Sequence, residues 1–162
     1  MKHINHRIVS AGVAAIAGAG PVAILGAVAG SVLPDFDIPL GIPHRTITHW
    51  WPLYAIAFGA PWLATTNPIL HQFFLWVAIG SVLHILEDSL TVGGVPLLNP
   101  FGKKFSFKVT RTGGILEYLI SLGIVVAVVL LFLKDPYYSQ SFKESTFTMM
   151  EHLRSLFRTI TP

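Results

Sequence analysis

Residues 8–33, IVSAGVAAIAGAGPVAILGAVAGSVL, decide how this chain folds. The stretch is apolar and rich in alanine and glycine, and the letters GAGP at 18–21 interrupt it. It forms either one spanning helix kinked at Pro21 or a hairpin of two short helices, 7–17 and 21–33. Because glycine and proline coincide at one point, we favour the hairpin, with Pro21 at a helix start. Each arm is then only about 18 Å long, too short to cross a bilayer alone.

The composition of the whole chain indicates a bilayer environment. Of the 162 residues, 52% are hydrophobic and only 12% are charged, and the mean hydropathy is +0.63. A soluble domain carries about a quarter charged residues. Further apolar stretches follow at 50–64, 69–90 and 115–133, and the last two are long enough to span the hydrocarbon core. We therefore expect an all-α, polytopic membrane bundle of about five helices, the first two forming the short hairpin.

The remaining segments are expected to be a loop and a tail. Residues 91–114 include four basic residues, and 105–109 alternates enough for a short strand. Beyond 133 the chain is polar, and 148–160 has apolar residues at helical spacing, which predicts an amphipathic interfacial helix. We expect 1–133 to be the membrane-embedded domain and 134–162 to be the tail. The N-terminal stretch is expected to stay on the protein, because its apolar run is longer than that of a signal peptide.

The candidate ligands for a metal ion are histidines and carboxylates. The chain has no cysteine, which excludes disulfides and thiolate metal sites. The strongest local signal is HILED at 84–88. On a helix His84 and Asp88 share a face, so they either hold one ion together or form a buried pair in which Asp88 sets the His84 tautomer. Glu87 reaches part of that face, as an alternative ligand or a base, and ionisable groups in membrane segments favour a functional role.

A second signal follows the first apolar stretch, with PDFD at 34–37 and HRTITH at 44–49. Pro34 ends the preceding helix and leaves two carboxylates at the membrane surface. Paired aspartates with nearby histidines suit zinc, manganese or iron, although a polar loop with an Asp helix cap has the same pattern. Arg45 is placed to clamp an anionic group, or to face lipid headgroups.

The hairpin decides whether these residues meet. In an up-and-down path, the start of the first helix lies beside the end of the second, which brings His3 and His6 next to the PDFD segment at 34–37. By the same path His49 comes close to His84, and Glu117 opens the last apolar stretch at the same end. A single kinked helix would instead put His6 across the bilayer from Asp35.

Basic residues predict on which side of the membrane the ligand-bearing end of the bundle lies. It carries Lys2, Arg7, Arg45, Lys103, Lys104, Lys108 and Arg111. The two opposite turns carry no Lys or Arg, so the positive-inside rule places the candidate ligands on the cytoplasmic side. His71 lies near an opposite turn and His152 in the tail, so neither is expected in the cluster.

Taken together, these motifs resemble the YdjM-like family of bacterial inner-membrane proteins, classed as metal-dependent hydrolases. The resemblance covers residues 2 to 117 and rests on His6, LPDFD at 33–37, the HR and TH pairs within 44–49, HILED at 84–88 and GVPLLNP at 94–100. The family is distantly similar to zinc-dependent phospholipase C and P1 nuclease, helical enzymes that cleave phosphoesters. In their pattern an Asp, a later His and a His-x-x-x-Asp ligate one zinc, and a further ion shares the last Asp.

The resemblance implies a membrane-bound metal-dependent hydrolase, acting on a phosphoester or lipid-like substrate through metal-activated water. The implied ion is zinc, with manganese or iron as alternatives, and the implied partners are membrane lipid and substrate, not nucleic acid. The expected metal ligands are His6, Asp35, His49, His84, Asp88 and Glu117. The expected catalytic residues are Asp37 or Glu87, as the general base, and Arg45, which would hold a negative group. The alternative function is a non-catalytic membrane metal-binding protein, namely a transporter, a store or a structural partner.

Overall fold

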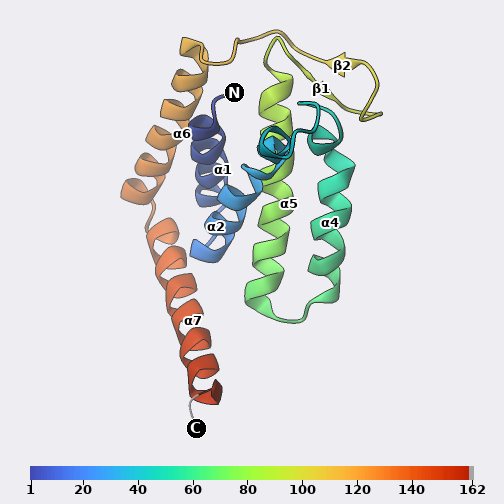
Figure 1. Ribbon diagram of the computed structural model, residues 1–162. Coiled ribbons are helices and arrows are strands. Elements are labelled where there is room, and N and C mark those ends of the chain that lie inside the picture. The colour runs from blue at the N-terminus through green and yellow to red at the C-terminus, as the bar shows by residue number, and fades with distance from the viewer. Residues whose placement is uncertain (161–162) are drawn as a thin grey trace.

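The computed structural model describes residues 1–160, which form a helical bundle (Figure 1). The longer helices are α1 (His3–Ile16), α2 (Pro21–Gly30), α4 (Trp51–Ala64), α5 (Pro68–Ser89), α6 (Ile115–Lys134) and α7 (Pro136–Ile160). Short helical turns connect α2 to α4: η1 (Leu33–Phe36), α3 (Asp37–Leu40) and η2 (Ile47–His49). The loop between α5 and α6 pairs two short antiparallel strands, β1 (Val95–Pro96) and β2 (Lys104–Phe105). The all-α class expected from the sequence is confirmed.

The N-terminal stretch is a hairpin, as the glycine–proline junction predicted. Gly18 has a φ of +71°, a left-handed conformation that glycine adopts at little cost, and Pro21 opens α2. The helix α1 begins at His3, earlier than the predicted 7–17. That extra turn carries His6, so it places a candidate ligand at the end of the bundle where α2 finishes.

Three helical stretches are long and apolar enough to cross a membrane: Pro21–Leu40, Pro68–Ser89 and Ile115–Lys134. The first is α2 continued by η1 and α3. By contrast, α4 has 14 residues and is about 21 Å long, shorter than the hydrocarbon core. The chain is therefore a polytopic membrane bundle in which half-length helices pack beside full-length ones.

The most extensive helix contact joins α2 to α5. A Cβ added to Gly30 would overlap the carbonyl oxygen of Val77, and a Cβ on Gly80 would overlap that of Ala27. The Ser81 hydroxyl also donates to the Gly30 carbonyl at 3.1 Å. Small residues let helix backbones touch in this way inside a membrane. The contact fixes the end of α2 against the last turns of α5, where the candidate ligands begin.

The α5–α6 loop differs from the prediction in its strand. We expected a strand at 105–109, whereas β2 covers only Lys104–Phe105. The next residues bond back to the end of α5 instead: the amide of Phe107 donates to the Ser89 carbonyl at 2.8 Å, and that of Val109 to the Leu90 carbonyl at 2.9 Å. Alternation alone could not distinguish pairing with a strand from pairing with a helix end.

The helix of the tail is longer than predicted. It begins at Pro136 rather than at 148, and it packs beneath the hairpin, where the Ser141 hydroxyl donates to the Gly18 carbonyl at 3.0 Å. The polar residues that open α7 hid its helical character in the hydropathy pattern. Residues 161–162 of the predicted tail lie outside the described part of the chain.

Candidate metal centre

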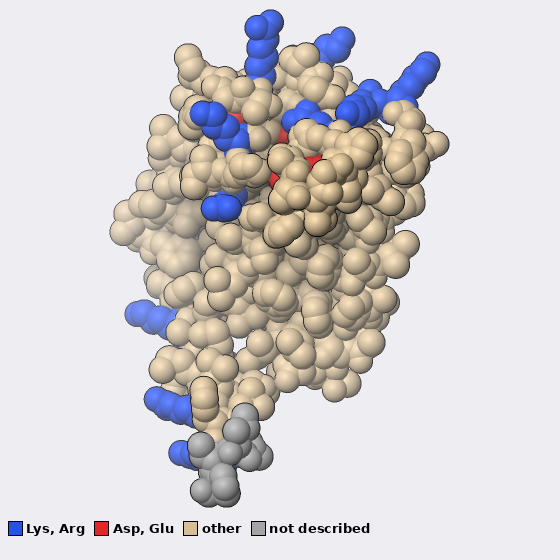
Figure 2. All heavy atoms as spheres, viewed as in Figure 1, with Lys and Arg blue, Asp and Glu red and all other residues tan. Residues whose placement is uncertain are grey.

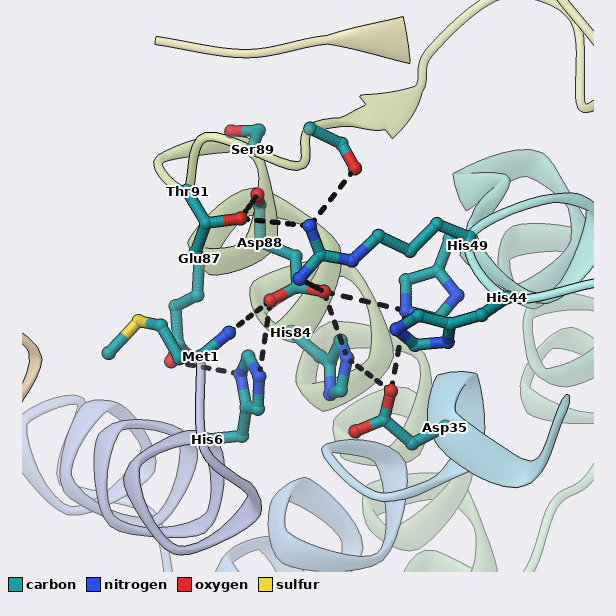
Figure 3. Close-up of polar contacts among 12 residues, drawn as sticks. Met1, His6, Asp35, His44, His49, His84, Glu87, Asp88, Ser89 and Thr91 are labelled. Atoms are coloured by element: carbon teal, nitrogen blue, oxygen red, sulfur yellow. Dashed lines mark hydrogen bonds and ion pairs between the residues drawn. The ribbon is translucent and has the colours of Figure 1, made fainter. Parts of the chain in front are cut away.

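A cluster of histidines and carboxylates lies where the last turn of α5 meets α1, η1 and η2 (Figure 3). Segments far apart in the sequence supply it: α1 carries His6, η1 carries Asp35, η2 carries His49, and α5 carries His84 and Asp88. The three imidazoles are fully buried, and Asp88 is 1% exposed. Buried ionisable groups are costly in a bilayer, so such a concentration at one end of the bundle indicates a function.

Two carboxylate oxygens of the cluster each lie near the same two imidazole nitrogens. The Asp35 Oδ1 atom lies 3.5 Å from Nε2 of both His49 and His84. The Asp88 Oδ2 atom lies 3.6 Å from Nε2 of His49 and 3.9 Å from Nε2 of His84. Ligands bound at about 2.0–2.1 Å around a tetrahedral ion are about 3.3–3.4 Å apart. A contraction of a few tenths of an ångström would give coordination spacing.

His49 and His84 each direct into this space a ring nitrogen that can be unprotonated. Neither Nε2 of His49 nor Nε2 of His84 has a hydrogen-bond partner in the described structure, because the nearby carboxylates lack hydrogen-bond geometry. The other ring nitrogen of His84, Nδ1, lies 2.6 Å from the Ser31 carbonyl oxygen, which can only accept. The proton of a neutral His84 therefore sits on Nδ1, and Nε2 presents its lone pair to the cluster.

Asp37 lies behind His49 and positions the ring together with Thr48, whose hydroxyl lies 3.2 Å from Nδ1 of His49. Its Oδ2 atom lies 3.4 Å from Nδ1 of His49 and accepts hydrogen bonds from the Thr48 hydroxyl at 2.8 Å and the Arg45 amide at 3.1 Å. The His44 ring lies 3.0 Å from the other oxygen. Both oxygens are thus engaged, as in the carboxylate–histidine pairs that orient metal ligands.

The carboxylates beside His49 favour the protonated form of its ring. Burial disfavours the imidazolium form, but the carboxylates of Asp35 and Asp88 outweigh burial and raise the pKa of His49 above its usual value. A proton and a divalent cation compete for the same ring nitrogen. The site therefore favours a positive charge, which either a proton or a metal ion can supply.

Arg45 is fixed over Asp88. Its Nη2 atom lies 2.8 Å from Asp88 Oδ2, while Nη1 donates to the Thr91 hydroxyl at 2.9 Å and faces the Gly94 carbonyl at 3.4 Å. Arg45 has a φ of +59°, a conformation that is uncommon outside glycine and is often found at functional sites. Its guanidinium lies against Gly93, where a Cβ would overlap it.

A second group adjoins the first through Asp88. Nε2 of His6 lies 3.5 Å from Asp88 Oδ1, and Nδ1 of His6 lies 3.1 Å from Glu87 Oε2. The ring of His6 stacks on that of His84 with centroids 3.7 Å apart. The amino group of Met1 also contacts Asp88 Oδ1. Two sets of residues are thus close enough to hold a metal ion, His6 with His84 and Asp88, and Asp35 with His44 and His49.

Glu117 stands apart from the histidines. It is fully buried and accepts from the Lys2 amide and from Asn5 Nδ2, both at 3.2 Å, while Ser121 donates to Asn5 Oδ1 at 3.1 Å. Within residues 1–160 no hydrogen bond or ion pair connects Glu117 to an imidazole. It joins the start of α1 to α6 rather than entering the cluster.

The structure adds residues that the sequence did not single out. The Ser31 carbonyl is a backbone group with no sequence signal, and Thr91 holds Arg45 from beyond the end of α5. His44 was visible in the HRTITH motif, but nothing in the spacing showed that its ring contacts Asp37. Of His3 and His6, which the sequence placed together beside Asp35, it is His3 that contacts Asp35, with Nδ1 2.9 Å from Oδ2.

The two remaining histidines lie at the opposite end, as predicted. Nε1 of Trp62 donates to His71, and Nδ2 of Asn67 lies 3.3 Å from His152 Nε2.

A cavity of about 600 Å³ opens onto the cluster. Its lining includes Lys2, His3, Asp35, Ile38, Arg45 and Asp88. The two carboxylates thus face the cavity, whereas His49 and His84 are behind them. In Figure 2 basic side chains surround this end, and acidic side chains are visible in the hollow between them.

Fold and site together define a helical membrane protein with a His/Asp cluster suited to a metal ion at one end of its bundle. The chain belongs to the YdjM inner membrane protein family, whose model matches residues 1–150. This match confirms the family resemblance seen in the sequence motifs. No curated protein and no solved structure matches the chain.

Proposed function

We propose that the cluster binds a divalent metal ion, with zinc as the first candidate, and that the protein hydrolyses a phosphoester. The observation that carries this proposal is the approach of Asp35 and Asp88 to His49 and His84 beside a cavity whose lining includes Lys2 and Arg45. Nitrogen and oxygen donors at this spacing suit zinc, and manganese or iron accepts the same donors. A divalent ion supplies acidification of a water molecule and polarisation of a phosphoryl oxygen.

The chain's own residues prepare the site for that ion. Asp35 and Asp88 supply two negative charges that balance a dication in a buried place. The Ser31 carbonyl and Asp37 hold the two histidines in orientation, so we assign Asp37 a positioning role rather than the role of a base. His6 and Glu117 are proposed, respectively, as a ligand for an adjoining ion and as an anchor for α1.

Two further residues are proposed to take part in the reaction, one by accepting a proton and the other by binding the negative charge of the substrate. Glu87 is 6% exposed, and its only ion-pair contact within residues 1–160 is with Nδ1 of His6, so it can accept a proton or join His6 on a second ion. The guanidinium of Arg45, fixed by Thr91 at the cavity, is placed to hold a negatively charged phosphoryl group.

The test compares Asp88→Asn with Glu144→Gln, which removes an exposed carboxylate from α7. We expect purified wild type and Glu144→Gln to retain zinc by elemental analysis and to cleave members of a phosphoester panel. Asp88→Asn should lose bound metal and at least about 100-fold of the turnover, because it removes a ligand charge. Equal zinc content and equal turnover in the two variants would refute the site.

One observation favours a second function, the non-catalytic metal protein. His6, His49 and His84 are all fully buried, as in a closed structural site. X-ray absorption of the zinc-loaded protein separates the two functions. A coordinated water oxygen besides the protein ligands supports the hydrolase, whereas a closed shell with no turnover on the panel supports a transporter, store or structural partner.

We also propose that the cluster lies on the cytoplasmic side, because the basic residues gather there. The chain has no cysteine, so single cysteines report orientation directly. Leu98→Cys at the cluster end is 92% exposed, and Leu63→Cys at the opposite end is 76% exposed. In intact cells an impermeant maleimide should label Leu63→Cys and spare Leu98→Cys; the reverse pattern would place the cluster outside.

A further inference from the structure

A lateral groove leads away from the cavity between α1 and the η1–α3 segment. Its volume is about 250 Å³, and its walls include Val32, Phe36, Ile38 and Pro39. His3, Asp35 and Ile38 line both the groove and the cavity, so the two spaces meet beside the candidate ligands.

The walls of this groove are apolar and open to the outside of the bundle. Phe36 is 48% exposed and Ile38 is 58% exposed, and Ile4, which lines the adjoining cavity, is 52% exposed. In a membrane protein exposed apolar side chains of this kind face acyl chains rather than water. The groove therefore offers an apolar surface that runs from the lipid toward a polar centre.

Basic residues accompany the groove without acidic partners. Arg7 lies in its wall and Lys2 lies at the cavity. Among residues 1–160, neither side chain has a carboxylate within ion-pair distance. Arg45 is at the inner end, over Asp88. Guanidinium groups prefer phosphate and carboxylate oxygens, which they bind in a planar, two-pronged fashion. The combination of an apolar wall with the Arg7 and Lys2 cations, neither of them paired with a carboxylate in the described chain, matches an amphiphile with an anionic headgroup.

We propose that the groove binds an acyl chain of an anionic membrane phospholipid whose phosphate lies in the cavity near Arg45. The lipid enters sideways from the leaflet, with its chain against Phe36 and Ile38 and its headgroup within reach of Arg7 and Lys2. This inference rests on the proposed function only for the fate of the phosphate. The binding mode itself follows from the continuity of the groove with the cavity and from the charges along it.

The test uses photo-crosslinking of the zinc-loaded, full-length protein in phosphatidylcholine nanodiscs. The probes are phosphatidic acid and phosphatidylcholine, each carrying a diazirine in one acyl chain. We expect peptide mapping to find phosphatidic acid adducts concentrated on residues 36–39 and on the start of α1. Excess unlabelled phosphatidic acid should compete them away, and the phosphatidylcholine probe should label these peptides several-fold less.

Matched variants sharpen this test. Ile38→Asn puts a polar group into the groove, and Ile56→Asn makes the same change on α4, where the side chain is 68% exposed. Adducts at 36–39 should fall about fivefold in Ile38→Asn and stay unchanged in Ile56→Asn, because only the first removes apolar contact with the chain. Arg7→Gln should lower the preference for phosphatidic acid over phosphatidylcholine.

The outcomes separate this inference from the proposed function. Equal labelling by both probes, or labelling spread evenly over the lipid-facing helices, would overturn the lipid site. Cleavage of a soluble phosphoester without groove adducts would also overturn it while leaving the hydrolase intact. Groove adducts without any turnover would support the lipid site and exclude the hydrolase function.

Discussion

The helix α5 carries a histidine near each end, and the two have different surroundings. His84 is buried among carboxylates, with Nδ1 on the Ser31 carbonyl and Nε2 directed at Asp35 and Asp88. His71 is half-buried at the opposite end, where Trp62 donates to its ring. The comparison shows that the neighbouring segments, rather than the imidazole or its helix, make one of these residues a candidate ligand.

The largest expected effect distinguishes these two histidines. His84→Gln should reduce zinc affinity more than about 100-fold, because changes that only touch the partners of a ligand already cost about 10–100-fold. His71→Gln should bind zinc like the wild type, since its ring contacts an indole far from the carboxylates. Chelator competition measures both affinities, and circular dichroism checks that both variants are folded. Indistinguishable affinities would place the ion elsewhere.

A smaller effect is expected when only the orientation of a ligand is disturbed. Asp37→Asn keeps the size of the side chain but weakens its hold on Nδ1 of His49, so zinc affinity should fall about 10–100-fold. Asp135→Asn is the matched control, because the Asp135 side chain is exposed and, within residues 1–160, accepts a hydrogen bond only from the amide of Tyr137. A loss of zinc affinity as large as that expected for His84→Gln would instead indicate that Asp37 is a direct ligand.

The response to pH should differ with and without metal. The raised pKa of His49 means that protonation stabilises the metal-free fold. This contribution is complete below the ordinary value of 6.5 and is lost as pH rises through the raised folded pKa. Thermal unfolding of the metal-free protein should therefore move to lower temperature as pH rises through this window.

Zinc should reverse that trend, because it binds the unprotonated ring and its affinity falls as pH falls. The measurement is a pair of unfolding series, with zinc and with a chelator. Parallel slopes in the two series would show that His49 does not change its protonation state on metal binding.

The smallest effect concerns the hairpin that brings α1 to the cluster. Gly18→Ala places a side chain at a φ of +71° and should destabilise the fold by about 1 kcal/mol. Gly59→Ala lies inside α4, where a Cβ meets nothing within 4 Å, and should be neutral or stabilising by up to about 1 kcal/mol. Denaturant titration in mild detergent measures both, and equal stabilities would mean that the turn does not constrain the hairpin.

Much of the cluster was predictable because few paths connect short helices. The glycine–proline junction indicated the hairpin, and an up-and-down path then required His49, His84 and Asp88 to share one end. Glu117 was expected in the cluster on the same reasoning. That reasoning specifies the end of a helix but not the direction in which a side chain points, and Glu117 points toward Asn5.

The partners of the ligands were beyond the reach of sequence patterns. The Ser31 carbonyl is backbone, and its position depends on the packing of α2 against α5. Arg45 reaches Asp88 only because its backbone adopts a positive φ and because Gly93 leaves room for the guanidinium. Periodicity also missed the start of α7, since the polar residues that open this helix lower the hydropathy of the segment.

The glycine contact between α2 and α5 has a consequence for how the protein tolerates its surroundings. Backbone atoms already touch at Gly30 and Gly80, so one helix cannot slide along the other without steric overlap. When the thickness or acyl order of the bilayer changes, the two helices change their tilt together, because the pair moves as a unit. The imidazole of His84 and the carbonyl that orients it therefore keep their register in thin and thick membranes alike.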